Sequence, residues 1–137
     1  MSTPRGNNIA QVGKDYVDRL IATDSSTEPQ LLVCIPVSVP DAATGDVDIV
    51  LTTKFEVVDV VCQKRNGAGA GNTVTAKSGA SAISDAIACA TDNAITRSAT
   101  IDDANSTILQ GGTLRLSCTR AAGTRNSLVL VYGFVRA

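Results

Sequence analysis

From Leu31 to its C-terminus the chain consists of short runs in which apolar and polar residues alternate, separated by Gly, Asn, Asp and Pro. A period of two residues places alternate side chains on opposite faces of an extended strand, so the pattern predicts β-strands with one buried face. No long amphipathic helix is indicated after Pro29. The sequence therefore predicts an all-β fold, a jelly-roll-like β-sandwich of about eight strands, with an up-and-down β-barrel as the alternative.

The first and last runs of this region have distinct roles in the predicted sheets. Leu31–Val39 alternates cleanly but contains Pro36, which cannot donate to a ladder, and this favours an edge strand or a strand end. Leu128–Val135 is apolar on both faces. That composition is typical of a central strand or of a strand covered by a partner.

Three inner segments carry additional local signals. Phe55–Cys62 changes phase midway, and a bulge near Val58 or Asp59 would reconcile its two halves. The Gly-rich segment Asn66–Asn72 precedes another alternating run, which indicates the loop of a hairpin. In Thr100–Ile108, a Thr at the start and two Asp residues shortly after it predict one turn of helix.

Composition changes at about Pro29 and divides the chain into an N-terminal arm, 1–29, and a β-sandwich domain, 30–137. Within the arm, Gln11–Ala22 fits either a helical stripe or a strand, and the pattern leaves this open. Met1–Ala10 is polar and lacks the apolar core of a secretory signal, so the protein is expected to act where it is synthesised.

The residue types present exclude several classes of function. The chain has no His, which removes Ser-His-Asp and Cys-His nucleophiles and His-ligated metal sites. A net charge of −1 with 3% aromatic residues argues against nucleic acid as a partner. No apolar run reaches the roughly 20 residues of a membrane span. We expect no enzymatic activity, no catalytic residues, no cofactor and no metal ligands.

The four cysteines are far apart in the sequence and include no CxxC pair. Each lies in an apolar, strand-like run, where a thiol behaves as a small hydrophobic side chain. The pattern favours reduced core thiols over a disulfide, although spacing alone does not exclude one. These residues are Cys34, Cys62, Cys89 and Cys118.

Charge is unevenly distributed along the chain. The segment from Asp41 to Asp59 holds five acidic residues and one basic residue, Lys54, whereas the chain after Ala104 holds four arginines and no acid. Two interpretations remain open. Opposite patches would suit docking in a fixed orientation against copies of the chain or a lattice, and cross-strand ion pairs within one domain would produce the same asymmetry.

Two stretches, Asn66–Ile87 and Thr96–Leu116, resemble the cement, or decoration, proteins of short-tailed bacteriophage heads, and the resemblance covers about Phe55–Ala137. It implies a structural virion protein, made in the bacterial host cytoplasm, that binds the outer surface of the major capsid protein lattice and stabilises the head. It also implies self-association as a homodimer or another homo-oligomer. The alternative is a head fibre or tail component that contacts a receptor or a carbohydrate.

Two parts of the chain are candidates for such contacts. A polar arm before a compact domain can order on binding to a neighbour. One apolar face of the last strand can contact a dimer partner or the capsid, and burial by a second sheet is an equal alternative for that face. The candidate interaction residues are Pro4, Arg5, Ile9, Tyr16, Leu20, Val129, Val131 and Val135.

Overall fold

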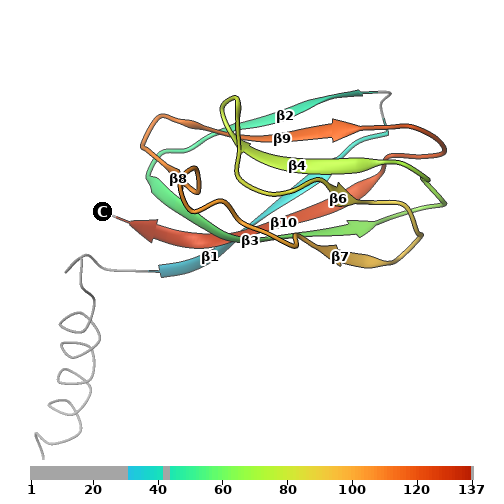
Figure 1. The fold of residues 1–137 in the computed structure, drawn as a ribbon, viewed down its shortest axis with the longest axis horizontal. Helices are drawn as coiled ribbons and strands as arrows, with labels where there is room; N and C mark the ends of the chain where they lie inside the picture. Colours follow the sequence, from blue (N-terminus) through green and yellow to red (C-terminus); the bar gives the residue numbers. More distant parts are fainter. Residues whose placement is uncertain (1–30, 42–43, 137) are drawn as a thin grey trace, which may run out of the picture. The chain divides into compact units, whose positions relative to one another are not determined.

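The computed structural model describes residues 31–41 and 44–136, which form two antiparallel β-sheets packed face to face (Figure 1). One sheet has the order β1-β10-β3-β7, with β8 also paired to β3, and the other has the order β2-β9-β4-β5, with β6 also paired to β4. The strands are β1 (Leu31–Val39), β2 (Thr44–Val50), β3 (Lys54–Lys64), β4 (Thr73–Ser78), β5 (Ser81–Ala82), β6 (Ile87–Ala88), β7 (Ile95–Arg97), β8 (Thr107–Ile108), β9 (Thr113–Thr119) and β10 (Ser127–Arg136).

The connections follow jelly-roll topology. β5 and β6 both pair with β4, and β7 and β8 both pair with β3, so each couple forms one interrupted strand. Counted in this way, eight strands form two four-stranded sheets, and successive strands change sheet except where β4 is followed by the interrupted strand β5–β6 beside it, as in a jelly roll. The predicted all-β, jelly-roll-like sandwich is confirmed. The up-and-down barrel is wrong because the strands form two separate sheets.

The edge and central strands lie where the sequence predicts them. Among residues 31–41 and 44–136, β1 pairs with β10 alone and forms the edge of its sheet, and Pro36 lies within it. β10 lies between β1 and β3 and pairs with both along its length. Its inward residues are buried and its outward residues are only partly buried, so the central position accounts for one of its two apolar faces and leaves the outward one unexplained.

The predicted bulge is present in β3. Tyr132 of β10 pairs with Asp59, but the next residue, Gly133, pairs with Val57, so Val58 is left without a partner in the ladder. One extra residue in β3 restores the alternation of the strand. The apolar residues of β3 on both sides of the bulge therefore face the same core. These buried residues are Phe55, Val57, Val60 and Cys62.

The predicted hairpin at Asn66–Asn72 is wrong. This segment joins β3 in one sheet to β4 in the other, so it crosses between the sheets. It packs against the loop between β9 and β10, where a Cβ atom added at Gly69 would lie 2.6 Å from the Thr124 carbonyl oxygen. Glycine is needed here for close backbone approach and not for a hairpin turn.

The predicted helical turn in Thr100–Ile108 is also wrong. Ile101 forms an isolated bridge with Ser84, and the segment ends in β8, which pairs with β3. Between them, Asp102 Oδ1 accepts a hydrogen bond of 2.9 Å from the Ala104 N–H, and the Asp102 carbonyl accepts one of 3.0 Å from Asn105. Short polar side chains form such local turns in competition with helix, and Asp102 organises this one.

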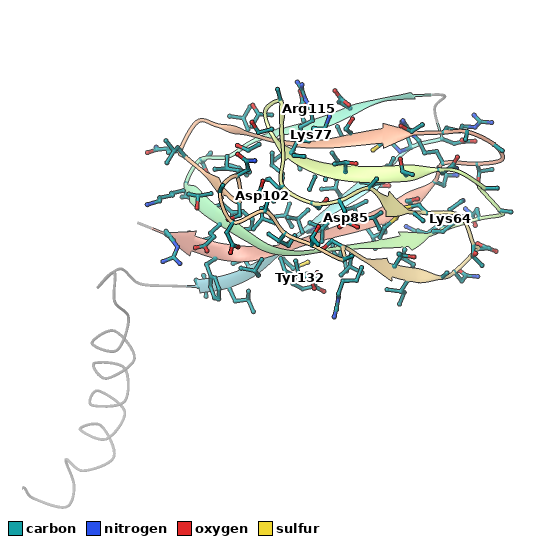
Figure 2. The ribbon with its side chains drawn as sticks, viewed as in Figure 1. Lys64, Lys77, Asp85, Asp102, Arg115 and Tyr132 are labelled. Atoms are coloured by element: carbon teal, nitrogen blue, oxygen red, sulfur yellow. A yellow bond between two sulfur atoms is a disulfide. The ribbon has the colours of Figure 1, made fainter. Side chains whose placement is uncertain are left out.

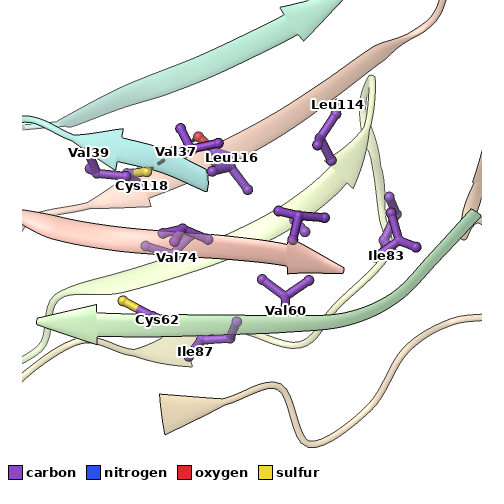
Figure 3. Close-up of a cluster of buried hydrophobic side chains, with 14 of the residues drawn as sticks. Val37, Val39, Val60, Cys62, Val74, Ile83, Ile87, Leu114, Leu116 and Cys118 are labelled. Carbon is purple, nitrogen blue, oxygen red and sulfur yellow. Dashed lines mark hydrogen bonds between the residues drawn. The ribbon is translucent and has the colours of Figure 1, made fainter. Parts of the chain in front are cut away.

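The core lies between the two sheets and draws its side chains from alternate positions of both (Figure 3). Removing a Val, Leu or Ile side chain from water contributes about 1.5–3 kcal/mol to folding. Valines predominate on the β1–β10–β3 side, where they face leucine and isoleucine residues of the opposite sheet and its loops. Core residues from the two sides include Val37, Val39, Val60, Val129, Val131, Val74, Ile83, Ile87, Leu114 and Leu116.

Cysteine usage differs from the prediction for three of the four residues. Cys62 of β3 and Cys89, which follows β6, form a disulfide with a Cα–Cα distance of 6.4 Å. These two side chains enter the core from opposite sheets, a proximity that sequence spacing does not reveal. Cys118 is a buried free thiol, as predicted, but Cys34 is exposed because strand alternation turns it outward.

Thiol counting tests this arrangement. Protein purified without reductant and then denatured should contain two titratable thiols, rising to four after reduction. In the native state Cys34 should react quickly with a thiol reagent and Cys118 slowly, because burial raises the pKa of the Cys118 thiol. Mass spectrometry of the labelled protein identifies each site, and four thiols before reduction would contradict the disulfide.

A Gly133→Ala substitution tests the packing at the bulge. The added Cβ would meet the Glu56 carbonyl oxygen and lie 2.5 Å from Cζ of the buried Phe55 ring. Overpacking of this kind costs about 1–3 kcal/mol, so the free energy of unfolding in urea should fall by that amount. Ser38→Ala, at an exposed position, is the control and should change stability little.

Candidate interaction surface

The outer face of the β1–β10–β3 sheet is apolar. Alternation turns Val129 and Val131 of β10 into the core, so Leu130 and Tyr132 point outward. Leu32 of β1 retains 57% of its surface exposed on this side. We call this surface the apolar face. It comprises Leu32, Cys34, Pro36, Leu128, Leu130, Tyr132 and Phe134, with Val61 of β3 beside Leu130 but only 6% exposed.

Strand register makes the apolar face continuous. Leu32 pairs with Phe134 and Cys34 with Tyr132, so these outward side chains are cross-strand neighbours. Pro36, Leu130 and Val61 form a row across three strands. Figure 2 shows Tyr132 on the side of the sandwich away from Arg115 and Lys77.

Charged residues border the apolar face on β3. Arg136 Nε donates a hydrogen bond of 2.7 Å to Glu56 Oε2, and Arg97 Nε lies 2.9 Å from Asp59 Oδ2. Both acids lie beside apolar residues of β10, since Glu56 pairs with Phe134 and Asp59 with Tyr132. An apolar centre with a polar rim is the usual organisation of a protein–protein contact.

The outer face of the other sheet is polar. Arg115 of β9 pairs with Asp48 of β2, donating hydrogen bonds of 2.8 Å from Nε and 2.9 Å from Nη2, and Asp46 lies 3.5 Å from the same Nε. The Arg115 hydrogen bond lowers the pKa of Asp48, and the Asp48 carboxylate raises the pKa of Arg115. The outward residues of β4 on this face are Thr73, Thr75 and Lys77.

Apolar residues scattered singly on a surface are ordinary, but a contiguous apolar patch rimmed by charge marks a contact with another molecule. The two outer faces of this sandwich differ in that respect. The β2–β9–β4 side suits water, and the β1–β10–β3 side suits a protein surface.

The uneven charge along the chain is explained by ion pairs within the domain. Each acidic residue between Asp41 and Asp59 lies against an arginine from later in the sequence. The cross-strand interpretation accounts for the asymmetry, and separate acidic and basic docking patches are not needed. The pairs are Asp41–Arg120, Asp46–Arg115, Asp48–Arg115, Glu56–Arg136 and Asp59–Arg97.

Two of the predicted contact residues cannot serve as contacts. Val129 and Val131 have no exposed surface, because the opposite sheet covers them. Val135 is partly buried and packs against the same core. The available surface of β10 is the opposite face of the strand. The candidates of the arm, Pro4, Arg5, Ile9, Tyr16 and Leu20, lie outside the described residues.

Two other features, a group of metal ligands and a membrane-spanning helix, are absent from the described residues. Across 31–41 and 44–136, no three His, Cys, Asp or Glu side chains are grouped as they would be around a metal ion. The same part of the chain has no helix with the length and apolar character needed to cross a membrane.

Comparison with known proteins does not assign the apolar face. No family model matches the chain, and no curated protein matches it. The role of the apolar face is therefore inferred from the residues that form it.

An Arg115→Gln substitution tests the polar face. The lowered pKa of Asp48 means that the ion pair contributes to stability above the ordinary aspartate pKa and is lost as the pH falls through the lowered value. Removing the guanidinium should return the pKa of Asp48 towards its ordinary value, as measured by NMR titration of the carboxyl carbon. Lys77→Gln on the same face is the control, and an equal effect there would contradict a specific pair.

Proposed function

We propose that this chain is a structural virion protein that binds the outer surface of a bacteriophage capsid lattice and stabilises the head. The observation that carries the proposal is the apolar face, opposed by a polar face on the other side of the sandwich. A protein with this asymmetry can lie with one side against a shell and the other towards solvent. The resemblance of Asn66–Ile87 and Thr96–Leu116 to phage cement proteins supports the same function.

The physical task of a cement protein fits a small sandwich without a reaction centre. A shell under internal pressure fails when its subunits separate, and a molecule that bridges two subunits adds interface area that opposes separation. When one contact has formed, the next forms at high effective concentration, so individually weak contacts suffice.

The side chains of the apolar face suit such a contact. Proline, valine, leucine and aromatic residues lose little rotamer freedom on docking compared with lysine or glutamate, so less of the gain from burial is lost to ordering. Tyr132 offers a hydroxyl beside a large apolar ring, a combination common at protein interfaces. Localisation on the virion and association with the major capsid protein are parts of this proposal.

The experiment uses heads of the virus that encodes the chain. Cryo-electron microscopy and mass spectrometry of purified particles should find the protein on the capsid surface, and heads lacking it should break at lower temperature. Added wild-type protein should restore heat resistance. A Leu130→Glu variant should bind heads at least about tenfold more weakly, because a carboxylate would have to be buried against an apolar surface.

Two further variants keep this test decisive. Leu32→Glu changes an exposed edge-strand position and should weaken binding even if Leu130→Glu disturbs folding. Thr75→Glu adds the same charge to the polar face and should bind as wild type does. Absence of the chain from mature particles, or equal binding by all three variants, would overturn the proposal. Specific binding to a glycan array with no binding to heads would instead favour a receptor-contacting fibre or tail component.

A further inference from the structure

Two cationic side chains are buried at one end of the sandwich, and neither forms an ion pair with a carboxylate of the described residues. Lys64 ends β3 and is 1% exposed, and Arg125 precedes β10 and is 4% exposed. Within 31–41 and 44–136, no acidic side chain lies within ion-pair distance of either. Buried charges are normally paired, so this arrangement is unusual.

The Lys64 ammonium is held by neutral oxygens only. Its Nζ donates to Thr124 Oγ1 at 2.7 Å and to the Arg65 carbonyl at 2.9 Å. The carbonyl oxygens of Asn66 and Asn126 lie at 3.3 and 3.4 Å. These contacts satisfy its hydrogen bonds and leave its positive charge without a counter-charge.

Arg125 is in a similar situation. Its Nε donates to the Pro40 carbonyl at 3.0 Å and its Nη1 to the Cys118 carbonyl at 3.4 Å. The nearby Asp41 carboxylate accepts from the Arg125 backbone N–H and from the Arg120 guanidinium. The charge of Asp41 is thus already engaged by another cation.

A polar pocket opens at the loop residues whose carbonyl oxygens hold the Lys64 ammonium. It has a volume of about 230 Å³ and is lined by Ser38, Val39, Arg65, Asn66, Asn126 and Ser127. The lining residues include one arginine, two asparagines and two serines but no acidic residue, and no ion pair engages Arg65 among the described residues. The backbones of Arg65, Asn66 and Asn126 also hold the Lys64 ammonium, which places that charge directly behind the pocket wall.

We propose that this pocket binds an oxyanion, the carboxylate or phosphate group of a ligand or neighbouring molecule. Uncompensated charges in a low-dielectric interior produce a positive potential at the nearest opening, and hydrogen-bond donors around that opening complete an anion site. Arg65 supplies the charged contact, and the Asn66 and Asn126 amides supply neutral ones. The proposal concerns the loop end of the sandwich and is independent of the apolar face and of capsid binding.

NMR titration of the full chain tests the site with two probes, inorganic phosphate and acetate, at constant ionic strength set with sodium chloride. Saturable shifts should appear at the amides of Asn66, Asn126 and Ser127. Saturation by both probes supports a site that takes carboxylates and phosphates, and saturation by phosphate alone supports a phosphate site. Shifts that never saturate, or that spread evenly over the surface, would overturn the proposal.

Matched variants separate a specific site from general charge. Arg65→Gln should weaken the apparent affinity at least about fivefold, as expected for loss of one charge-assisted hydrogen bond at a partly open site. Asn126→Asp, which places a carboxylate in the pocket, should abolish binding. Lys77→Gln removes one positive charge from the β4 face and should leave the affinity unchanged. An equal loss with Lys77→Gln and Arg65→Gln would overturn the site.

Discussion

Burial of one face of each sheet against the other is the interaction on which the rest of the structure depends. Apart from the connection of β4 to β5 and β6, each connection between the main strands passes from one sheet to the other, and the buried side chains of both sheets form a single cluster. The core therefore forms only when both sheets are present, and it uses the inward residues of every long strand. Once this requirement is met, the two outer faces are free to differ, and here one is apolar and the other is ion-paired.

The sequence allows the strands and their special positions to be predicted, but not how they combine. Period-two alternation locates β1, β3 and β10, Pro36 marks an edge, and the phase change in β3 locates the bulge at Val58. Pairing partners depend on contacts between residues far apart in the chain. For that reason the Gly-rich crossover is mistaken for a hairpin, and the Cys62–Cys89 proximity is invisible. The turn organised by Asp102 resembles a helix start because the same residue type favours both.

Prediction of the contact surfaces from the sequence is limited for the same reason. Alternation establishes that β10 has two apolar faces, but the choice of which face the second sheet covers requires the three-dimensional arrangement, and Val129 and Val131 are on the covered one. The uneven distribution of charged residues along the chain suggests separate acidic and basic surface patches. The three-dimensional structure instead places most of these residues in ion pairs. Lys64 lies two residues after Cys62 in β3, so alternation turns both side chains inward. A lysine at the end of a strand nevertheless normally indicates the start of an exposed loop. Its burial becomes visible only when the loop containing Thr124 folds over it.

The position of Pro36 has a consequence for molecules held at high density. β1 is an edge strand of nine residues with an apolar outer side, the kind of edge that templates strand addition and fibre growth. A proline midway along it has no N–H to give to an incoming strand, so a ladder begun at either end of β1 is interrupted at its centre. Crowded copies can thus remain discrete particles and avoid polymerisation into a continuous cross-β sheet.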